Sequence, residues 1–136
     1  MSGMRPIPTA ALLALLALLA VPARGDPTTA SGAEIYQRYC ASCHGADGRG
    51  DGPAAATLDP LPSDLTAIAR RRAGKFPHSE IHEIVDGRAV LPAHGTRAMP
   101  VWGYEFEAGA PQAAPGRAAA QSMTQRLVTY LQSLQR

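Results

Sequence analysis

Two cysteines and a histidine lie within five consecutive residues, Cys40-Ala41-Ser42-Cys43-His44. This Cys-x-x-Cys-His spacing is typical of the attachment site of a c-type haem. On a turning chain, cysteines three residues apart point to the same side, so both thiols can add to the two vinyl groups on one haem edge. His44 then follows directly, placed to bind the iron. The motif therefore predicts one haem c, bound covalently through Cys40 and Cys43, with His44 as the proximal iron ligand.

Other chemistries use a similar cysteine pair, and the sequence disfavours them. A thiol–disulfide oxidoreductase would use Cys40 and Cys43 as free thiols, but such a pair usually follows a strand in a βαβ unit, and no strand is expected before Cys40. A structural zinc site would require four ligands, and the chain has only two cysteines. A disulfide across two residues would be strained. The thiol enzyme remains the less favoured alternative.

A second iron ligand is needed to complete a low-spin haem, and five side chains could supply it. Met99 precedes Pro100 in a segment without helical periodicity and follows His44 by 55 residues, enough chain to reach the opposite haem face. We therefore expect Met99 to be the second ligand, in a histidine–methionine pair that raises the redox potential. His94, in the same segment, is the main alternative. The other candidates are expected to pack in the core or lie on the surface: Met123, His78 and His82.

The first 25 residues have the pattern of a secretory signal peptide. Arg5 gives a positive start, residues 10–21 form an apolar run of 12 residues, and small residues follow in 22–25. A membrane-spanning helix needs about 20 apolar residues, so this run is too short to be a typical span. We expect cleavage within 23–25 and a periplasmic location, whereas an uncleaved leader would be a membrane anchor. Residues 26–31 are then a linker, and residues 32–136 form one domain.

Charge and size restrict the function of this domain. The chain has 13 Lys and Arg against 11 Asp and Glu, and Arg5 and Arg24 leave with the leader, so the mature chain has no formal net charge. A nucleic-acid binder is therefore not expected. A domain of this size is marginally stable without a disulfide, metal or cofactor, and an apolar cofactor would extend its core.

The pattern along residues 32–136 predicts an all-helical fold. Ser31 and Glu34 fit a capping box that opens a helix ending before Gly45, and the glycine-rich residues 45–53 predict a loop. Periodicity and end signals predict further helices, and low periodicity predicts loops over residues 88–101 and 103–117. The first of these helices is expected from Ser63 or Asp64 to Arg72. The second is expected from Pro77 to Asp86, with an apolar stripe of Ile81, Ile84 and Val85. The last is expected over about 118–135, with an inward face of Leu127, Tyr130, Leu131 and Leu134.

Three segments carry the most specific resemblance to a known family: residues 32–53 (GAEIYQRYCASCHGADGRGDGP), residues 86–88 (DGR) and residues 99–103 (MPVWG). With them the chain resembles the single-haem class I cytochrome c family, in its short proteobacterial exported form, over nearly all of 32–136. The resemblance implies a cytochrome c fold in which the terminal helices cross over the haem. It also implies thioethers at Cys40 and Cys43 and iron ligation by His44 and Met99. In this family a proline carbonyl supports the proximal histidine, which points to Pro60 or Pro62. The long 103–117 segment departs from the pattern.

The function expected from these features is single-electron transfer by a haem iron that cycles between Fe(II) and Fe(III), with unidentified redox proteins as partners and no small-molecule substrate. A haem c subunit of a larger periplasmic oxidoreductase is the alternative to a free carrier. Two features remain open. Trp102 is expected either beside the haem or in the core, and the basic cluster of residues 70–75 either faces solvent or steers an acidic partner. Tyr36 or Tyr39 is expected against Tyr130 and Leu127 where the terminal helices cross.

Overall fold

The computed structural model describes residues 29–88, 99–110 and 116–136, and the expected signal peptide (1–25) and His94 lie outside these ranges. The described chain is helical, and the expected all-α class is confirmed. No described helix is long and apolar enough to cross a membrane. In chain order, the elements are α2 (Gly32–Tyr39), α3 (Ala41–His44), η1 (Ala55–Thr57), η2 (Leu65–Ala67), α4 (Ile68–Arg71), α5 (His78–Asp86), α6 (Trp102–Ala108) and α7 (Gly116–Ser133).

Helix α2 begins with the capping box expected from the sequence. The Ser31 hydroxyl accepts a hydrogen bond from the Glu34 amide at 3.2 Å, and the Glu34 carboxylate accepts one from the Ser31 amide at 2.7 Å. The Ser31 hydroxyl also donates to the Glu34 carboxylate at 2.7 Å, and this bond, together with the one from the Ser31 amide, holds the pKa of Glu34 below its ordinary value. The helix ends earlier than expected, because Cys40 separates α2 from the single turn of α3.

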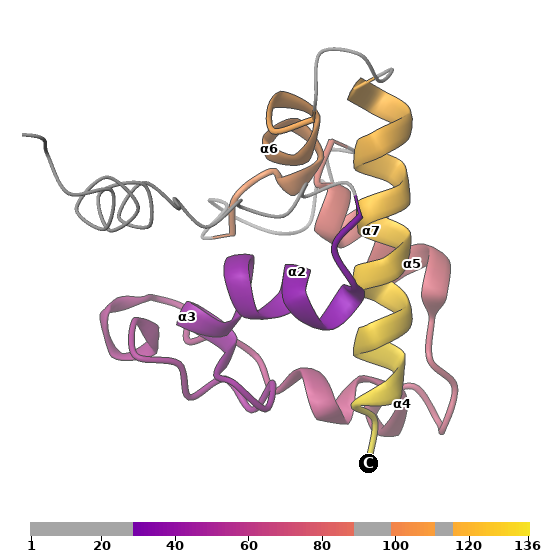
Figure 1. The fold of residues 1–136 in the computed structure, drawn as a ribbon. Coiled ribbons are helices and arrows are strands. Elements are labelled where there is room, and N and C mark those ends of the chain that lie inside the picture. Colours follow the sequence, from indigo (N-terminus) through magenta and orange to yellow (C-terminus); the bar gives the residue numbers. More distant parts are fainter. Residues whose placement is uncertain (1–28, 89–98, 111–115) are drawn as a thin grey trace, which may run out of the picture.

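The terminal helices pack directly against each other. Helix α2 lies across α7 (Figure 1), and the rings of Tyr36 and Tyr130 are 5.5 Å apart at the crossing, as the sequence predicts for one of its tyrosines. Gly32 makes this close approach possible, since a Cβ atom there would overlap the carbonyl oxygen of Arg126 on α7. The Arg126 side chain in turn donates a hydrogen bond from Nε to the Ala30 carbonyl at 2.7 Å.

We expect Gly32→Ala to lower the free energy of unfolding by about 1–3 kcal/mol, because the added methyl group must push two backbones apart. Gly109→Ala is the matched control: Gly109 has an ordinary right-handed backbone, and a Cβ atom there would lie 3.4 Å from the nearest described atom, the Glu105 carbonyl oxygen. Denaturant unfolding followed by circular dichroism would measure both. Equal stability of the two variants would contradict the close crossing.

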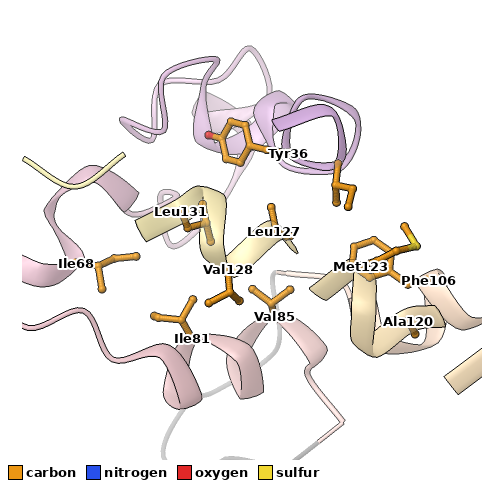
Figure 2. Packing of buried hydrophobic residues seen from close by; sticks show 11 residues of the cluster. Tyr36, Ile68, Ile81, Val85, Phe106, Ala120, Met123, Leu127, Val128 and Leu131 are labelled. Carbon is orange, nitrogen blue, oxygen red and sulfur yellow. The ribbon is translucent and has the colours of Figure 1, made fainter. Parts of the chain in front are cut away.

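Helix α7 is the centre of the hydrophobic core. Its inward face contacts α2, α5 and α6, and Figure 2 shows side chains from α5 on one side of it and Phe106 of α6 beside Met123. Two α7 residues, Leu127 and Val128, are each 1% exposed. The cluster consists of Ile35, Tyr36, Ile68, Ile81, Val85, Phe106, Ala120, Met123, Leu127, Val128 and Leu131.

Three sequence-based expectations about the helices are wrong in part. Residues 102–108 form α6 although a loop was expected over 103–117, because Trp102 and Phe106, one turn apart, stack on each other and bury Phe106 against the core. This packing outweighs the low helix propensity of Gly103. Ile84 is 38% exposed, so the buried stripe of α5 is Ile81 and Val85 only. The last helix begins at Gly116, two residues earlier than expected.

Candidate functional site

One cavity brings the chemistry-bearing residues together. It has about 650 Å³ of empty space, its open mouth included. Cys40, Cys43 and His44 lie on one part of its wall, and Met99 lies on another. The rest of the lining is almost entirely apolar: Tyr39, Leu58, Pro62, Leu65, Pro100, Trp102 and Leu131.

The break at Cys40 and the turn of α3 place the motif. Cys40 keeps right-handed helical torsions, and the amides of Cys43 and His44 both donate to its carbonyl, at 3.1 and 2.9 Å. The chain therefore continues to turn through the motif, as two thiols directed to one side require. Cys40 and Cys43 are both half-buried free thiols.

The glycine-rich loop after His44 folds back over α3. The Gly50 amide donates to the His44 carbonyl at 2.8 Å, and the Tyr36 hydroxyl donates to the Gly45 carbonyl at 2.6 Å. A Cβ atom at Gly52 would overlap the carbonyl oxygen of Ser42, so the loop touches α3 where only glycine fits. The loop thus holds the histidine end of the motif in place.

The imidazole of His44 is oriented by a backbone carbonyl. Its Nδ1 lies 3.0 Å from the carbonyl oxygen of Ser63. A carbonyl only accepts, so Nδ1 carries the proton and Nε2 keeps its lone pair free for a metal ion. A contact of this kind fixes the ring and increases the basicity of the ligand. The expected support from Pro60 or Pro62 is therefore wrong: the acceptor is the residue after Pro62, and Pro62 itself lines the cavity.

Met99 is the only one of the proposed sixth ligands among the described residues that lines this cavity. Met123 is 1% exposed and packs in the core beside Phe106 and Ala120 (Figure 2), so its sulfur serves packing. His78 and His82 line a separate polar hollow on α5 with Gln125 of α7. Within the described ranges, no group of three or more His, Cys, Asp or Glu side chains is placed to hold a metal ion.

The aromatic residues beside the cavity form one packed group. The Tyr39 ring meets Trp102 at 5.6 Å and Phe106 at 5.3 Å, both edge to face, and Trp102 stacks on Phe106 at 5.8 Å. Trp102 therefore does both things that the sequence left open, since it packs on the core and also forms part of the cavity wall. The group connects α2, which leads to the cysteines, with α6, which follows Met99.

The Cys40 thiol is poorly suited to thiol–disulfide exchange. Burial, and then the neighbouring Cys43, raise the pKa of the Cys40 thiol to about 12. A redox-active cysteine pair needs a thiolate, and its pKa is normally lowered by a positive charge or a helix N-terminus. An apolar cavity with a protonated Cys40 thiol on its wall fits an apolar cofactor better than an enzyme that uses a free thiolate at this position.

The basic cluster of residues 70–75 lies away from the cavity lining. Arg71 donates to the Asp64 carbonyl at 2.9 Å, and Arg72 pairs with Glu80 on α5. Two of its four cations thus have partners within the chain, which favours a solvated helix face. Nothing else among the described residues at this cluster indicates a docking site for an acidic partner.

Residues 27–114 match the protein family described as cytochrome c oxidase, cbb3-type, subunit III. The chain belongs to this cytochrome c family. The match spans the motif, the Ser63 support and Met99, and it is consistent with a single-haem class I cytochrome c. Neither the search of curated proteins nor that of solved structures found a match.

Membership in this family supports the haem-based electron transfer expected from the sequence. Cytochromes c of this family carry haem with iron and transfer electrons, and redox proteins are their partners. The sequence predicted the four residues of the cavity that could bind a haem: Cys40, Cys43, His44 and Met99. It did not predict the Ser63 carbonyl, because a backbone acceptor can come from any residue type. It gave Leu58 and Leu65 no place in the apolar wall, whereas it had expected Trp102 beside the haem or in the core and Leu131 on the inward face of the last helix.

Proposed function

We propose that this cytochrome is a single-electron carrier with one haem c, covalently attached through Cys40 and Cys43, and with His44 and Met99 as the axial iron ligands. The observation that carries the proposal is the apolar cavity on whose wall all four side chains lie. We also propose that the chain is exported by residues 1–25 and acts in the periplasm, where its partners are other redox proteins.

The residues present fit a haem in three respects. The apolar wall suits the porphyrin face, and the two half-buried thiols lie on that wall, where they can reach one edge of the group. The His44–Ser63 hydrogen bond leaves Nε2 as the free nitrogen. When bound, the haem supplies a reversible one-electron couple at its iron.

The chain's own contribution is to hold the ligands and exclude water. His44 is fixed by Ser63, and Met99 offers a thioether, which favours the reduced iron and raises the redox potential. The apolar lining from Leu58, Leu65 and Leu131 lowers the local dielectric and limits solvent access to the site. With His44 and Met99 both as ligands, the iron would have no position left for a substrate, so electron transfer is the chemistry supported best.

The family description favours a second candidate, a haem c subunit of a larger oxidoreductase such as an oxidase. The two candidates share the same site and differ in whether the chain works alone. Isolation of the protein from its native membranes and soluble fraction, followed by identification of what copurifies, separates them: a free carrier is recovered alone, and a subunit is recovered in fixed proportion to its partners.

The proposed cofactor is tested by the absorption spectrum of the purified native protein. We expect a Soret band, a sharp α-band of the c type after reduction, and full reversal on oxidation. After denaturation the colour should stay with the polypeptide, at one haem per chain. A colourless protein with two reactive thiols would overturn the proposal and support the thiol–disulfide alternative.

A further inference from the structure

Arg88 connects the end of α5 with the beginning of α6. It follows Gly87, the left-handed residue that ends α5 with a φ of 70°. Its Nε donates to both carboxylate oxygens of Asp86, at 2.8 and 3.1 Å, and its Nη1 donates to the Glu107 carboxylate on α6 at 3.0 Å. The side chains of Arg88 and Asp86 are only 15% and 16% exposed, so this pair is screened less than a surface ion pair.

The pair packs directly on the backbone of α6. Gly103 is buried, and a Cβ atom there would lie 2.5 Å from Nε of Arg88 and 2.7 Å from the Asp86 carboxylate. The Tyr104 ring covers the guanidinium with a centroid distance of 5.6 Å. Gly103 and Tyr104 form the first turn of α6 together with Trp102, which is itself part of the cavity wall.

Met99 is connected to this turn through Pro100 and Val101. Met99, Pro100 and Trp102 contribute neighbouring parts of the wall, and α6 begins three residues after Met99. The Arg88 contacts therefore fix the C-terminal end of the short segment that carries the thioether. Arg88 also has a buried Nη2 without an acceptor among the described residues, and a buried donor left unpaired is a cost that native proteins rarely retain without a reason.

We propose that Arg88 is a positioning residue for the sixth iron ligand. By clamping the first turn of α6 against the end of α5, it holds the Met99 thioether toward the cavity and keeps competing ligands from replacing it. The inference rests on the proposed ligation by Met99 and assigns a role to residues that do not themselves touch the cavity.

The test is the affinity of the ferric holoprotein for added imidazole, which binds only when the thioether leaves the iron. We expect Arg88→Met, which keeps the length of the side chain and removes its charge and donors, to bind imidazole at least tenfold more tightly than the unaltered protein. Arg72→Met removes the exposed pair with Glu80 and should leave the affinity unchanged. Glu107→Gln, which weakens only the α6 side of the clamp, should shift the affinity in the same direction as Arg88→Met by a smaller factor.

Thermal melting of the same proteins separates positioning from general stability. Ile68→Val, in the core on α4, should lower the melting temperature without changing imidazole affinity, because Ile68 lies away from α6. Unchanged affinity in both Arg88→Met and Glu107→Gln overturns the proposal. If Arg88→Met does not fold, Glu107→Gln decides, since the Glu107 side chain is 42% exposed and its loss leaves the Arg88–Asp86 pair intact.

The two proposals fail in different ways. Met99 ligation predicts a weak sulfur-to-iron absorption band in the unaltered ferric protein. If that band is absent, Met99 ligation fails, and the role of Arg88 fails with it. If the band is present and the Arg88 and Glu107 variants bind imidazole like the unaltered protein, only the role of Arg88 is overturned.

Discussion

Replacement of both cysteines, Cys40→Ala with Cys43→Ala, is expected to abolish covalent haem attachment completely. The cavity wall offers no other thiol, since these are the only two cysteines in the chain. The check is a denaturing gel stained for haem peroxidase activity, together with the intact mass of the polypeptide. The unaltered chain should keep one haem through denaturation, and the double variant should keep none.

The same change is also expected to destabilise the fold strongly. Leu131 is 3% exposed and lines the cavity as well as the core, so an empty cavity adjoins the centre of the molecule. A domain of this small size has little stability to lose. We expect the double variant to unfold at a much lower denaturant concentration than the holoprotein, as measured by circular dichroism.

Ser42→Ala is the matched control for the double variant. Ser42 lies between the cysteines, is exposed, and offers its hydroxyl only a long contact of 3.8 Å to the Cys43 sulfur. The Ser42→Ala variant should keep its covalent haem in full and nearly all of its stability. Haem that survives denaturation in the double cysteine variant would contradict the attachment proposed here.

The motif could be predicted from sequence because its chemistry depends on local spacing. Cys40, Cys43 and His44 are brought to one side by a single helical turn, and the loop that follows them is specified by glycines at positions such as Gly45, Gly48 and Gly50, each with φ near 80°. Such features depend on residues a few positions apart. The capping box at Ser31 and the helix end at Gly87 were predictable for the same reason.

Features that depend on contacts between distant segments were predicted less well. The carbonyl that supports His44 belongs to Ser63, 19 residues away, and any residue type could supply it. Helix α6 contains Gly103 and has little apolar periodicity of its own, so its helical form depends on the packing of Phe106 against α7 and Tyr39. The Arg88 clamp likewise joins residues 19 positions apart.

The Met99 prediction lies between these two cases. The neighbouring Pro100 and the distance from His44 pointed to Met99 as the second ligand. The spacing alone also allowed His94 in the same segment. The fold narrows the choice among the described candidates, because Met123 is committed to the core and His78 and His82 line another surface hollow. The absorption spectrum of the ferric protein distinguishes Met99 from His94, because only the thioether ligand gives the sulfur-to-iron band.

Met99→Ala is expected to remove the sulfur-to-iron band of the ferric protein and to lower its reduction potential. A thioether stabilises Fe(II) relative to Fe(III), so its loss should shift the potential downward by on the order of 0.1 V or more, within the roughly 0.8 V that axial ligands span. Both thioether attachments should remain, because Cys40 and Cys43 are unchanged. The measurements are the visible spectrum and a potentiometric titration of the purified holoprotein.

Two controls make this result specific to the ligand. Met123→Leu conserves volume at a buried position away from the cavity, so it should cost less than about 1.5 kcal/mol in stability and leave the band and the potential unchanged. His94→Ala should likewise keep the band. Persistence of the band in Met99→Ala would contradict ligation by Met99. If the unaltered protein lacks the band and the His94→Ala variant loses the low-spin spectrum, the sixth ligand is His94. Because the proposed effect of Arg88 acts through Met99, loss of the thioether should also remove the effect of Arg88 on imidazole binding. Met99→Ala and the double variant Met99→Ala, Arg88→Met should therefore bind imidazole equally well.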